Sequence, residues 1–481
     1  MSMNPSLTVS DACDPSSAKE LLLGLIEQAL ESSEHPRAVR VEIPIKTIRP
    51  LDWLREQPFA AKVYWMERGG TFEAAGAGIA DVLHADADPE AREQAATSCS
   101  RAFAALQGRV ANGHANLRYY GGVRFGQNRP CSEAWSRYGE FRFVLPRFEL
   151  LSSGDQTYLA CNALGVPQTE REDLMDEIRA DLAALVIPDD ADDAAQVSVP
   201  ALITRRDMPD HDAWTAMINR ALDAFDEGQI DKVVLARETE LTCAGPLDPL
   251  TILARLTGKT QRSFHFCFQL DEQTAFLGAT PELLFKRQDR YVQSEAVAGT
   301  CARASDPTVD EALGQSLLQS EKDRREHKYV VDTIRSVFDK LCHAVHGDRT
   351  VSLLKLARVQ HLFYRLEGIL TDSISDADIL NSLHPTPAVG GFPTAAALRR
   401  IAEWEPFDRG WYAGPVGWVG PNAAVFAVGI RSGLIHGDTL HLFAGAGIVA
   451  GSNADREWSE IENKMDGFLS ALVDEPSVHD C

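Results

Sequence analysis

A glycine-rich stretch near the C-terminal end of the chain, residues 444–464, constrains the fold more than any other segment. It reads AGAGIVAGSNADREWSEIENK and follows Leu440–Phe443, a short apolar run that predicts a strand. Glycines let a backbone approach a ligand closely and turn N–H groups toward an anion. Ser452 and Asp455 then have the spacing of a capping box, which marks the start of a helix. The stretch therefore predicts a strand, a glycine-rich loop that binds an anion, and a helix.

The predicted helix places three charged residues beside an apolar face. Glu457, Glu460 and Lys464 are three and four residues apart, so they share one side of the helix. Two carboxylates and an ammonium group next to an anion site suggest a metal ion and an acidic ligand. The alternative is a solvated acidic helix edge with one ion pair, and this segment alone leaves both interpretations open. The apolar face comprises Trp458, Ile461, Met465, Phe468, Leu469 and Leu472.

The overall charge limits the classes of ligand. The chain has 481 residues and a formal net charge of −23, which argues against nucleic acid or an anionic membrane as the main partner. An anionic substrate would need local positive charge or a metal, because the overall field repels it. Nine cysteines are dispersed without metal-ligand spacing, as is typical of free thiols in a reducing compartment. The sequence has neither a signal peptide nor 18 consecutive apolar residues, so we expect a cytoplasmic protein that does not cross a membrane.

The organisation of the chain suggests a tail followed by two regions. Residues 1–17 are polar and predict a disordered tail. Residues 18–200 alternate between helical and strand patterns and end in an acidic, proline-punctuated segment, 187–200. Residues 201–475 hold the densest cluster of strands and motifs. Length alone suggests two or three domains.

Two charged residues lie within apolar runs. Lys232 begins the run KVVLAR and shares a strand face with Val234 and Ala236. Burial lowers the pKa of a lysine, as a general base requires, whereas a lysine at a strand end can instead reach water. Glu282 lies in GATPELLF between Pro281 and an apolar triplet. It is a candidate general acid with a raised pKa, or a solvated carboxylate at a strand end.

The segment 310–345 predicts one long helix with a buried stripe. Counting back four residues from Val330 places Glu326 on that stripe, one turn before its apolar part. Glu326 either joins Glu457 and Glu460 around Mg²⁺, which prefers carboxylate oxygens, or belongs to a charged helix face. His327 lies off the stripe and is predicted to be exposed.

Two further segments carry polar residues with a possible ligand role. HPTPAVGGFP, residues 384–393, predicts a turn-rich loop in which His384 contacts either a ligand hydroxyl or the loop itself. The segment 424–433, AVFAVGIRSG, predicts a strand on which Arg431 alternates in phase with Gly429 and Ala427. These small neighbours leave room beside a guanidinium group, which suits carboxylate recognition.

Taken together, these motifs resemble the chorismate-utilising enzyme family. KVVLAR, GATPE, AGT, SEKDRREH, HPTPAVGGFP, YAGPVGW, GIR, AGAGIV and EWSEIENK occur in the family's order. KVYWMERGG and FRFVLPRFEL also resemble the N-terminal half of its isochorismate synthases, so the similarity spans roughly residues 40–475. The resemblance implies an α/β (α+β) fold of large antiparallel sheets packed face to face with flanking helices. It also implies that residues 18–200 and 201–475 form a single structural domain.

The resemblance assigns a role to each site residue. Lys232 matches the general base that activates water, and Glu282 matches the acid that protonates the departing 4-hydroxyl group. Glu326 and Glu460 match Mg²⁺ ligands, and Glu457 matches a partner that reaches the metal through a ligand or a water molecule. The expected substrate contacts are Gly299, Thr300, His384, Tyr412, Arg431, Gly445, Ala446, Gly447 and Lys464.

Within that family the motifs favour isochorismate synthase of the menaquinone or siderophore type. Ala298 stands where the aminodeoxychorismate synthases carry a lysine nucleophile, and HPTPAVGG resembles the isochorismate synthase form of its loop. The alternatives are a salicylate synthase, which also eliminates pyruvate, and the large subunit of an ammonia-using anthranilate synthase. The resemblance further implies chorismate as the substrate, Mg²⁺ as the cofactor, and a monomer without an obligatory protein partner.

Overall fold

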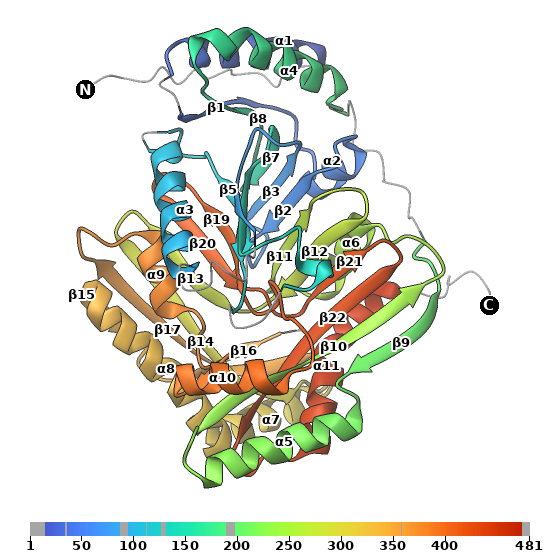
Figure 1. Cartoon of the computed structure of the whole chain (residues 1–481), viewed down its shortest axis with the longest axis vertical. Coiled ribbons are helices and arrows are strands. Elements are labelled where there is room, and N and C mark those ends of the chain that lie inside the picture. The colour runs from blue at the N-terminus through green and yellow to red at the C-terminus, as the bar shows by residue number, and fades with distance from the viewer. Residues whose placement is uncertain are drawn as a thin grey trace.

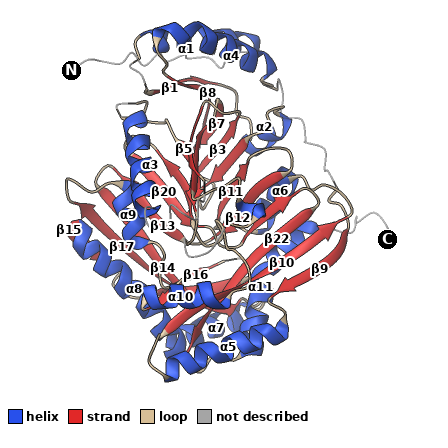
Figure 2. Cartoon of the chain, in the orientation of Figure 1, coloured by secondary structure: helices blue, strands red, loops and turns tan. Residues whose placement is uncertain are grey.

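The computed structural model describes residues 15–33, 36–86, 95–111, 113–126, 131–188, 198–356 and 358–473. Within these ranges two antiparallel sheets form the centre of the molecule, and α-helices cover their outer faces (Figures 1 and 2). Most of the predicted tail and of the segment 187–200 lies outside the described residues. No helix in the described part of the chain has the length and apolar character needed to cross a membrane.

The larger sheet has twelve strands in the order β1-β8-β7-β3-β2-β11-β12-β21-β22-β10-β18, with β9 also paired to β10. The strands are β1 (Ala38–Pro44), β2 (Lys62–Met66), β3 (Phe72–Ala77), β7 (Phe148–Ser153), β8 (Gln156–Leu164), β9 (Leu202–Met208), β10 (Lys232–Cys243), β11 (Phe264–Gln269), β12 (Thr274–Thr280), β18 (Gly391–Phe392), β21 (Ser432–His436) and β22 (Thr439–Val449).

The smaller sheet has ten strands in the order β15-β17-β14-β13-β20-β19-β5-β6-β4, with β16 also paired to β17. The strands are β4 (Asp81–Ala85), β5 (Tyr119–Val123), β6 (Phe141–Leu145), β13 (Leu283–Gln288), β14 (Tyr291–Ala302), β15 (Cys342–Gly347), β16 (Ser352–Lys355), β17 (Val359–Leu370), β19 (Pro415–Val419) and β20 (Ala423–Val428). Each sheet therefore contains strands from both sides of residue 200.

The helices are amphipathic and pack on the sheets through their apolar faces. They are α1 (Pro15–Glu31), α2 (Pro50–Glu56), α3 (Ala95–Val110), α4 (Arg171–Ala184), α5 (His211–Asp226), α6 (Pro249–Lys259), α7 (Pro307–Gln319), α8 (Glu321–Leu341), α9 (Asp376–Leu383), α10 (Thr394–Trp404) and α11 (Ala454–Leu472). Helix α8 packs on β14 and β17 of the smaller sheet, and α11 packs on β22 of the larger one. These two helices carry all three predicted metal ligands.

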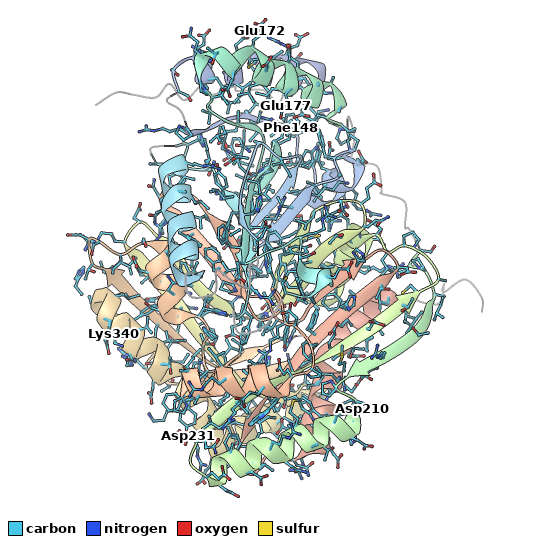
Figure 3. All side chains as sticks on the ribbon, in the orientation of Figure 1. Phe148, Glu172, Glu177, Asp210, Asp231 and Lys340 are labelled. Atoms are coloured by element: carbon cyan, nitrogen blue, oxygen red, sulfur yellow. The ribbon has the colours of Figure 1, made fainter. Side chains whose placement is uncertain are left out.

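The inner faces of the two sheets meet in an aromatic core. Phe72 on β3 and Trp418 on β19 have ring centroids 6.1 Å apart, and the Tyr120 hydroxyl on β5 donates to Glu149 on β7 at 2.8 Å. Figure 3 shows Phe148 inside the fold and charged side chains such as Glu172 at the periphery. The predicted class of large antiparallel sheets packed face to face with flanking helices is confirmed.

The chain passes between the two sheets at two short links that matter for function. Pro281 and Glu282 connect β12 of the larger sheet to β13 of the smaller one. Residues 429–431 connect β20 of the smaller sheet to β21 of the larger one. Arg431 has a φ of 49°, a left-handed conformation that non-glycine residues rarely adopt and that concentrates at functional sites. The prediction of one strand over 424–433 was wrong, because the chain leaves the smaller sheet after Val428.

Two other local predictions differ from the structure. The predicted helix over 310–345 is two helices, because the Ser320 hydroxyl caps α8 by accepting from the Asp323 N–H, and residues 342–347 form β15. The predicted capping box of Ser452 and Asp455 is absent. Asn453 caps α11 instead and accepts from the Arg456 N–H, while the Ser452 hydroxyl accepts from the Val449 N–H at 3.2 Å.

Candidate active site

One cavity of about 100 Å³ between the two sheets collects most of the predicted site residues. They reach it from β14, β22, α8, α11, both inter-sheet links and the turn before β19. Segments that lie far apart in the sequence therefore converge on a single site. The predicted residues that line the cavity are Glu282, Gly299, Thr300, Glu326, Tyr412, Arg431, Gly445, Gly447, Glu457, Glu460 and Lys464.

The glycine-rich segment is a strand rather than the predicted loop. Residues 439–443 of β22 pair with both β21 and β10, whereas residues 444–449 pair with β10 alone. The Gly445 carbonyl accepts from Lys464 Nζ at 2.8 Å, on the side of β22 that faces away from β10. The N–H groups of Gly445 and Gly447 face the same side, because they alternate with residues that bond to β10. The cavity is therefore bordered by an open strand edge that offers main-chain donors.

The two glycines also make room for functional side chains. A Cβ at position 447 would lie 2.5 Å from Glu326 Oε1 and 3.3 Å from the Cε atom of Lys232. A Cβ at position 445 would lie 3.0 Å from the Tyr412 hydroxyl. Only glycine allows these groups to approach the strand so closely. Ala446 lies between the two glycines, points to the opposite face and is fully buried, so it does not line the cavity.

Glu282 is a buried carboxyl group suited to proton donation. The residue is 3 % exposed, and burial raises the pKa of its carboxyl group to about 8, with a further contribution from Glu295 and opposition from Lys232 and Lys464. None of the described residues forms an ion pair with it, so it lacks the contact that would favour the charged form. Glu282 is therefore protonated near neutral pH, and the raised pKa predicted from its apolar flanks is confirmed.

Lys232 lies directly behind the cavity wall. It is 0 % exposed, and its Nζ atom donates to Glu326 Oε1 at 3.0 Å. The interpretation of Lys232 as a lysine that reaches water from a strand end is thus wrong. Glu326 lines the cavity and Lys232 does not, so the predicted base is next to the cavity rather than exposed in it.

Arg431 presents a positive charge without a matching carboxylate. Its Nη2 atom donates to His361 Nε2 at 2.9 Å, and no described acidic residue forms an ion pair with it. His361 must therefore be neutral, with its proton on Nδ1, which lies 3.0 Å from the Thr300 hydroxyl oxygen and 3.3 Å from the Gly299 carbonyl. Burial, followed by Arg431 and Lys464, holds the pKa of His361 well below its ordinary value. A guanidinium group with a neutral neighbour remains available for an anionic ligand.

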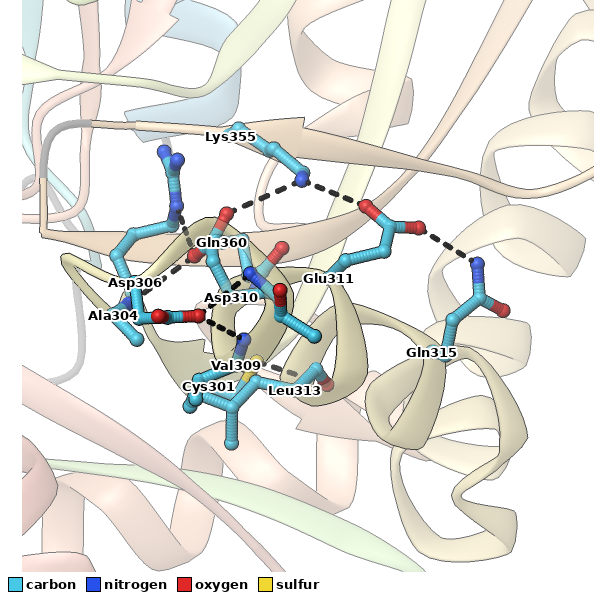
Figure 4. A network of polar contacts seen from close by, with 12 residues as sticks. Cys301, Ala304, Asp306, Val309, Asp310, Glu311, Leu313, Gln315, Lys355 and Gln360 are labelled. Atoms are coloured by element: carbon cyan, nitrogen blue, oxygen red, sulfur yellow. Dashed lines mark hydrogen bonds and ion pairs between the residues drawn. The ribbon is translucent and has the colours of Figure 1, made fainter.

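The turn at Gly299 shapes the opposite wall of the cavity. Gly299 has a φ of 73° and lies at a register shift between β14 and β17, as a bulge requires. The strand is anchored just beyond it. The Asp310 carboxylate on α7 accepts hydrogen bonds from Arg303 Nε at 2.6 Å and from Lys355 Nζ at 3.3 Å. The Gln360 side chain donates to the Asp310 carbonyl (Figure 4). This network links the residue that follows β14 to α7, β16 and β17.

Three glutamates provide the oxygen donors that a hard cation prefers. They line the cavity with Arg431, and the space that a Cβ at position 447 would fill lies next to Glu326. The chemistry of this set fits Mg²⁺. In the described part of the chain, no three acidic, histidine or cysteine side chains lie close enough together to hold a metal. Each of them instead contacts a lysine.

Two histidines differ from their predicted positions. His384 does not reach this cavity; it lines a separate one of about 300 Å³, and its ring packs edge-on against Phe125 with centroids 5.7 Å apart. His327 was predicted to be exposed but is 2 % exposed and contacts the Ala296 carbonyl through Nε2 at 3.1 Å. The buried face of helix α8 is wider than its apolar stripe indicated, because β14 also packs against the helix at His327.

His361, Lys322 and Asp323 were not predicted as site residues. All three line the cavity. A signal for His361 exists, because Gln360 and His361 are consecutive polar residues in the otherwise apolar start of β17. A lone histidine in a strand is, however, insufficient to assign a site.

Comparison with known proteins gives consistent matches. The profile of the family described as "Chorismate binding enzyme" matches residues 24–473. The chain belongs to this family. It is 36 % identical to the chloroplastic isochorismate synthase of Catharanthus roseus over 74 % of the chain and 62 % of that protein. It is 31 % identical to isochorismate synthase MenF of Escherichia coli, over 95 % of the chain and 98 % of that relative.

A solved structure of this chorismate-binding enzyme family matches the whole architecture. The menaquinone-specific isochorismate synthase MenF of Escherichia coli superposes with a TM-score of 0.80 and 29 % sequence identity, covering 95 % of this chain and all of the solved one. The recognition of a chorismate-utilising enzyme from its motifs is therefore confirmed.

Proposed function

We propose that the protein is an isochorismate synthase, an isomerase that converts chorismate reversibly into isochorismate. The reaction adds water at C2 of the ring, shifts the double bonds and releases the hydroxyl group at C4. The observation that carries the proposal is the cavity that combines the buried Glu282, whose pKa burial raises to about 8, with Arg431, which forms no ion pair with a carboxylate of the described residues. The names of the relatives that match nearly the whole chain point to the same reaction.

Chorismate is a dianion, and the cavity offers a separate group for each of its carboxylates. Arg431 and the open edge of β22 at Gly445 and Gly447 would bind the enolpyruvyl carboxylate. The ring carboxylate would lie toward Glu326, Glu457 and Glu460, the residues that would hold Mg²⁺. The metal would neutralise the ring carboxylate and fix the position of the ring. Thr300 and Lys464 would make further contacts to the bound substrate.

The catalytic steps then follow from two groups. Lys232, in its unprotonated form, removes a proton from the water whose oxygen attacks C2. Glu282 donates its proton to the C4 oxygen, which leaves as water. No bond forms between enzyme and substrate, which agrees with Ala298 rather than a nucleophile in the cavity wall. Reactant and product are isomers with similar bonds, so we expect the reaction to approach an equilibrium from either side.

The test is to incubate the purified protein with chorismate and Mg²⁺ and to separate the products, with and without EDTA and ammonium. We expect isochorismate approaching an equilibrium mixture, blocked by EDTA and indifferent to ammonium. Salicylate and pyruvate as direct main products would instead identify a salicylate synthase. Anthranilate formed only with ammonium would identify an ammonia-using synthase.

The proposal includes a cytoplasmic monomer that needs no partner protein. All residues that are assigned a role above belong to this one chain, which supports the proposal that it acts without a second subunit. We expect the activity per chain to be independent of protein concentration. Measuring it alongside size-exclusion chromatography tests this, and activity that falls on dilution as the protein dissociates would contradict it.

A further inference from the structure

Each predicted Mg²⁺ ligand is held by its own lysine. Such one-to-one pairing offsets the mutual repulsion of the carboxylates. It also means that a divalent cation can bind only by competing with ammonium groups for the same oxygens. The pairs are Lys232 with Glu326 at 3.0 Å, Lys322 with Glu457 at 3.2 Å, and Lys464 with Glu460 at 2.7 Å.

The three lysines differ in how easily each can leave its glutamate and move into solvent. The Lys232 side chain is 0 % exposed, and that of Lys464 is 19 % exposed and also donates to the Gly445 carbonyl. The Lys322 side chain is 46 % exposed, although its partner Glu457 is only 4 % exposed. Lys322 can therefore turn into solvent, whereas the other two remain enclosed.

The place of Lys322 on its helix supports this reading. It occupies the second position of α8, where the partial positive charge of a helix N-terminus disfavours a cation. The neighbouring Glu321 and Asp323 have the sign that this position favours. The lysine is instead matched by the Glu457 carboxylate across the cavity mouth, in the first turn of α11.

We propose that Lys322 is an exchangeable internal cation, which neutralises Glu457 in the metal-free protein and moves into solvent when Mg²⁺ binds. It lowers the affinity for the metal and stabilises the empty site. This inference rests on the metal site of the proposed function. Lys322 acts through Glu457 and takes no part in the reaction itself.

The test is calorimetric titration of the metal-free protein with Mg²⁺, comparing the wild type with Lys322→Ala and Lys322→Arg. Because one competing, partly exposed ion pair is removed, the alanine variant should bind Mg²⁺ at least about threefold more tightly. The arginine variant retains the competing charge and should resemble the wild type. The control is Lys328→Ala on the same helix, whose side chain is 70 % exposed and pairs with Asp332; its Mg²⁺ affinity should be unchanged.

Thermal unfolding gives a second readout that does not depend on activity. Without metal, Lys322→Ala leaves the buried Glu457 carboxylate unpaired, so its Tm should fall below that of the wild type, and added Mg²⁺ should raise it by more. Unchanged or weaker Mg²⁺ binding in Lys322→Ala overturns the inference while leaving the metal site intact. A wild-type protein that binds no Mg²⁺ overturns the proposed metal site and the inference together.

Discussion

Two buried clusters of charged side chains lie toward opposite edges of the larger sheet, and they have opposite designs. The first, which we call the closed cluster, consists of Arg40, Tyr120, Glu149 and Asn162. Arg40 forms a fully buried ion pair with Glu149 at 2.8 Å and also contacts Asn162, and Tyr120 donates to the other Glu149 oxygen. The second cluster surrounds the cavity, where neither Glu282 nor Arg431 forms an ion pair with any residue that the structure describes.

The difference shows how similar residue types serve stability in one place and chemistry in another. In the closed cluster each charge meets its counter-charge inside the protein, so both side chains are held by fixed contacts. In the cavity burial raises the pKa of Glu282 to about 8, and Arg431 donates to a neutral histidine and forms no ion pair with any carboxylate in the described part of the chain. Unmatched groups that face an open space are prepared to act on a ligand. The following substitutions test this contrast.

The largest effect is expected for the two proton-transfer residues. Lys232→Ala and Glu282→Gln should each lower kcat by about 10²- to 10⁴-fold, since each removes one partner in general acid–base catalysis. The glutamine variant conserves shape and lacks the ionisable carboxyl group, so its Tm should not fall below that of the wild type. Steady-state rates of isochorismate formation, together with circular dichroism, check both points. Near-normal turnover in either variant would remove that residue from its role.

Loss of a metal ligand should nearly match this effect. Glu326→Ala should abolish Mg²⁺-dependent activity, because it removes one predicted carboxylate ligand and also leaves the buried Lys232 without its partner. The measurement is activity across a Mg²⁺ titration. Replacing Glu321, on the same helix but outside the cavity lining, serves as the control. Persisting activity in Glu326→Ala would show that the metal ligands lie elsewhere.

The closed cluster should respond in stability rather than in turnover. Glu149→Gln removes one of the two carboxylates paired with the buried Arg40, the other being Glu42 at 2.9 Å, and should lower the free energy of unfolding by about 2 kcal/mol. Chemical denaturation measures this loss. The kcat per folded molecule should remain at the wild-type value. A variant of unchanged stability but low kcat would show that the two clusters do not separate the roles as described.

The pH dependence should give the smallest and most specific effect. The Glu282 carboxyl group donates a proton only below its pKa of about 8, so activity should fall as the pH rises above that value. The same raised pKa lowers stability as the pH increases, because the folded state holds a proton that the unfolded state releases from about pH 4.5 upward. The destabilisation grows through this window and is complete above about pH 8. Glu282→Gln should remove this part of the stability profile; an unaltered profile would place the raised pKa on another group.

The sequence predicted side-chain chemistry better than it predicted local backbone. Glu282 was assigned a raised pKa from its apolar flanks, and burial in the structure raises it. The strand over 424–433 and the capping box at Ser452 were wrong for a common reason. Each depends on which partner forms a hydrogen bond with a given group. Strand β20 ends where the chain changes sheets, and the Ser452 hydroxyl already accepts a hydrogen bond from the Val449 N–H.

The site residues that were not predicted from the sequence have contact partners that are remote in sequence. His361 lies 70 residues from Arg431, and the pairing of Lys322 with Glu457 spans 135 residues. No periodicity encodes such contacts, because they arise only after α8, α11 and the two sheets have packed. The burial of His327 was missed for the same reason, since it depends on β14.

The open edge of β22 has a consequence for how such an enzyme can change over time. Its donors at Gly445 and Gly447 belong to the peptide backbone, so a mutation can obstruct them but cannot change their chemical identity. The side chains around them, such as Ala298, can be exchanged one at a time. These backbone donors are common to every sequence with this strand, so they can persist while the side chains beside them change. Enzymes with this strand can therefore keep chorismate as the substrate and form different products.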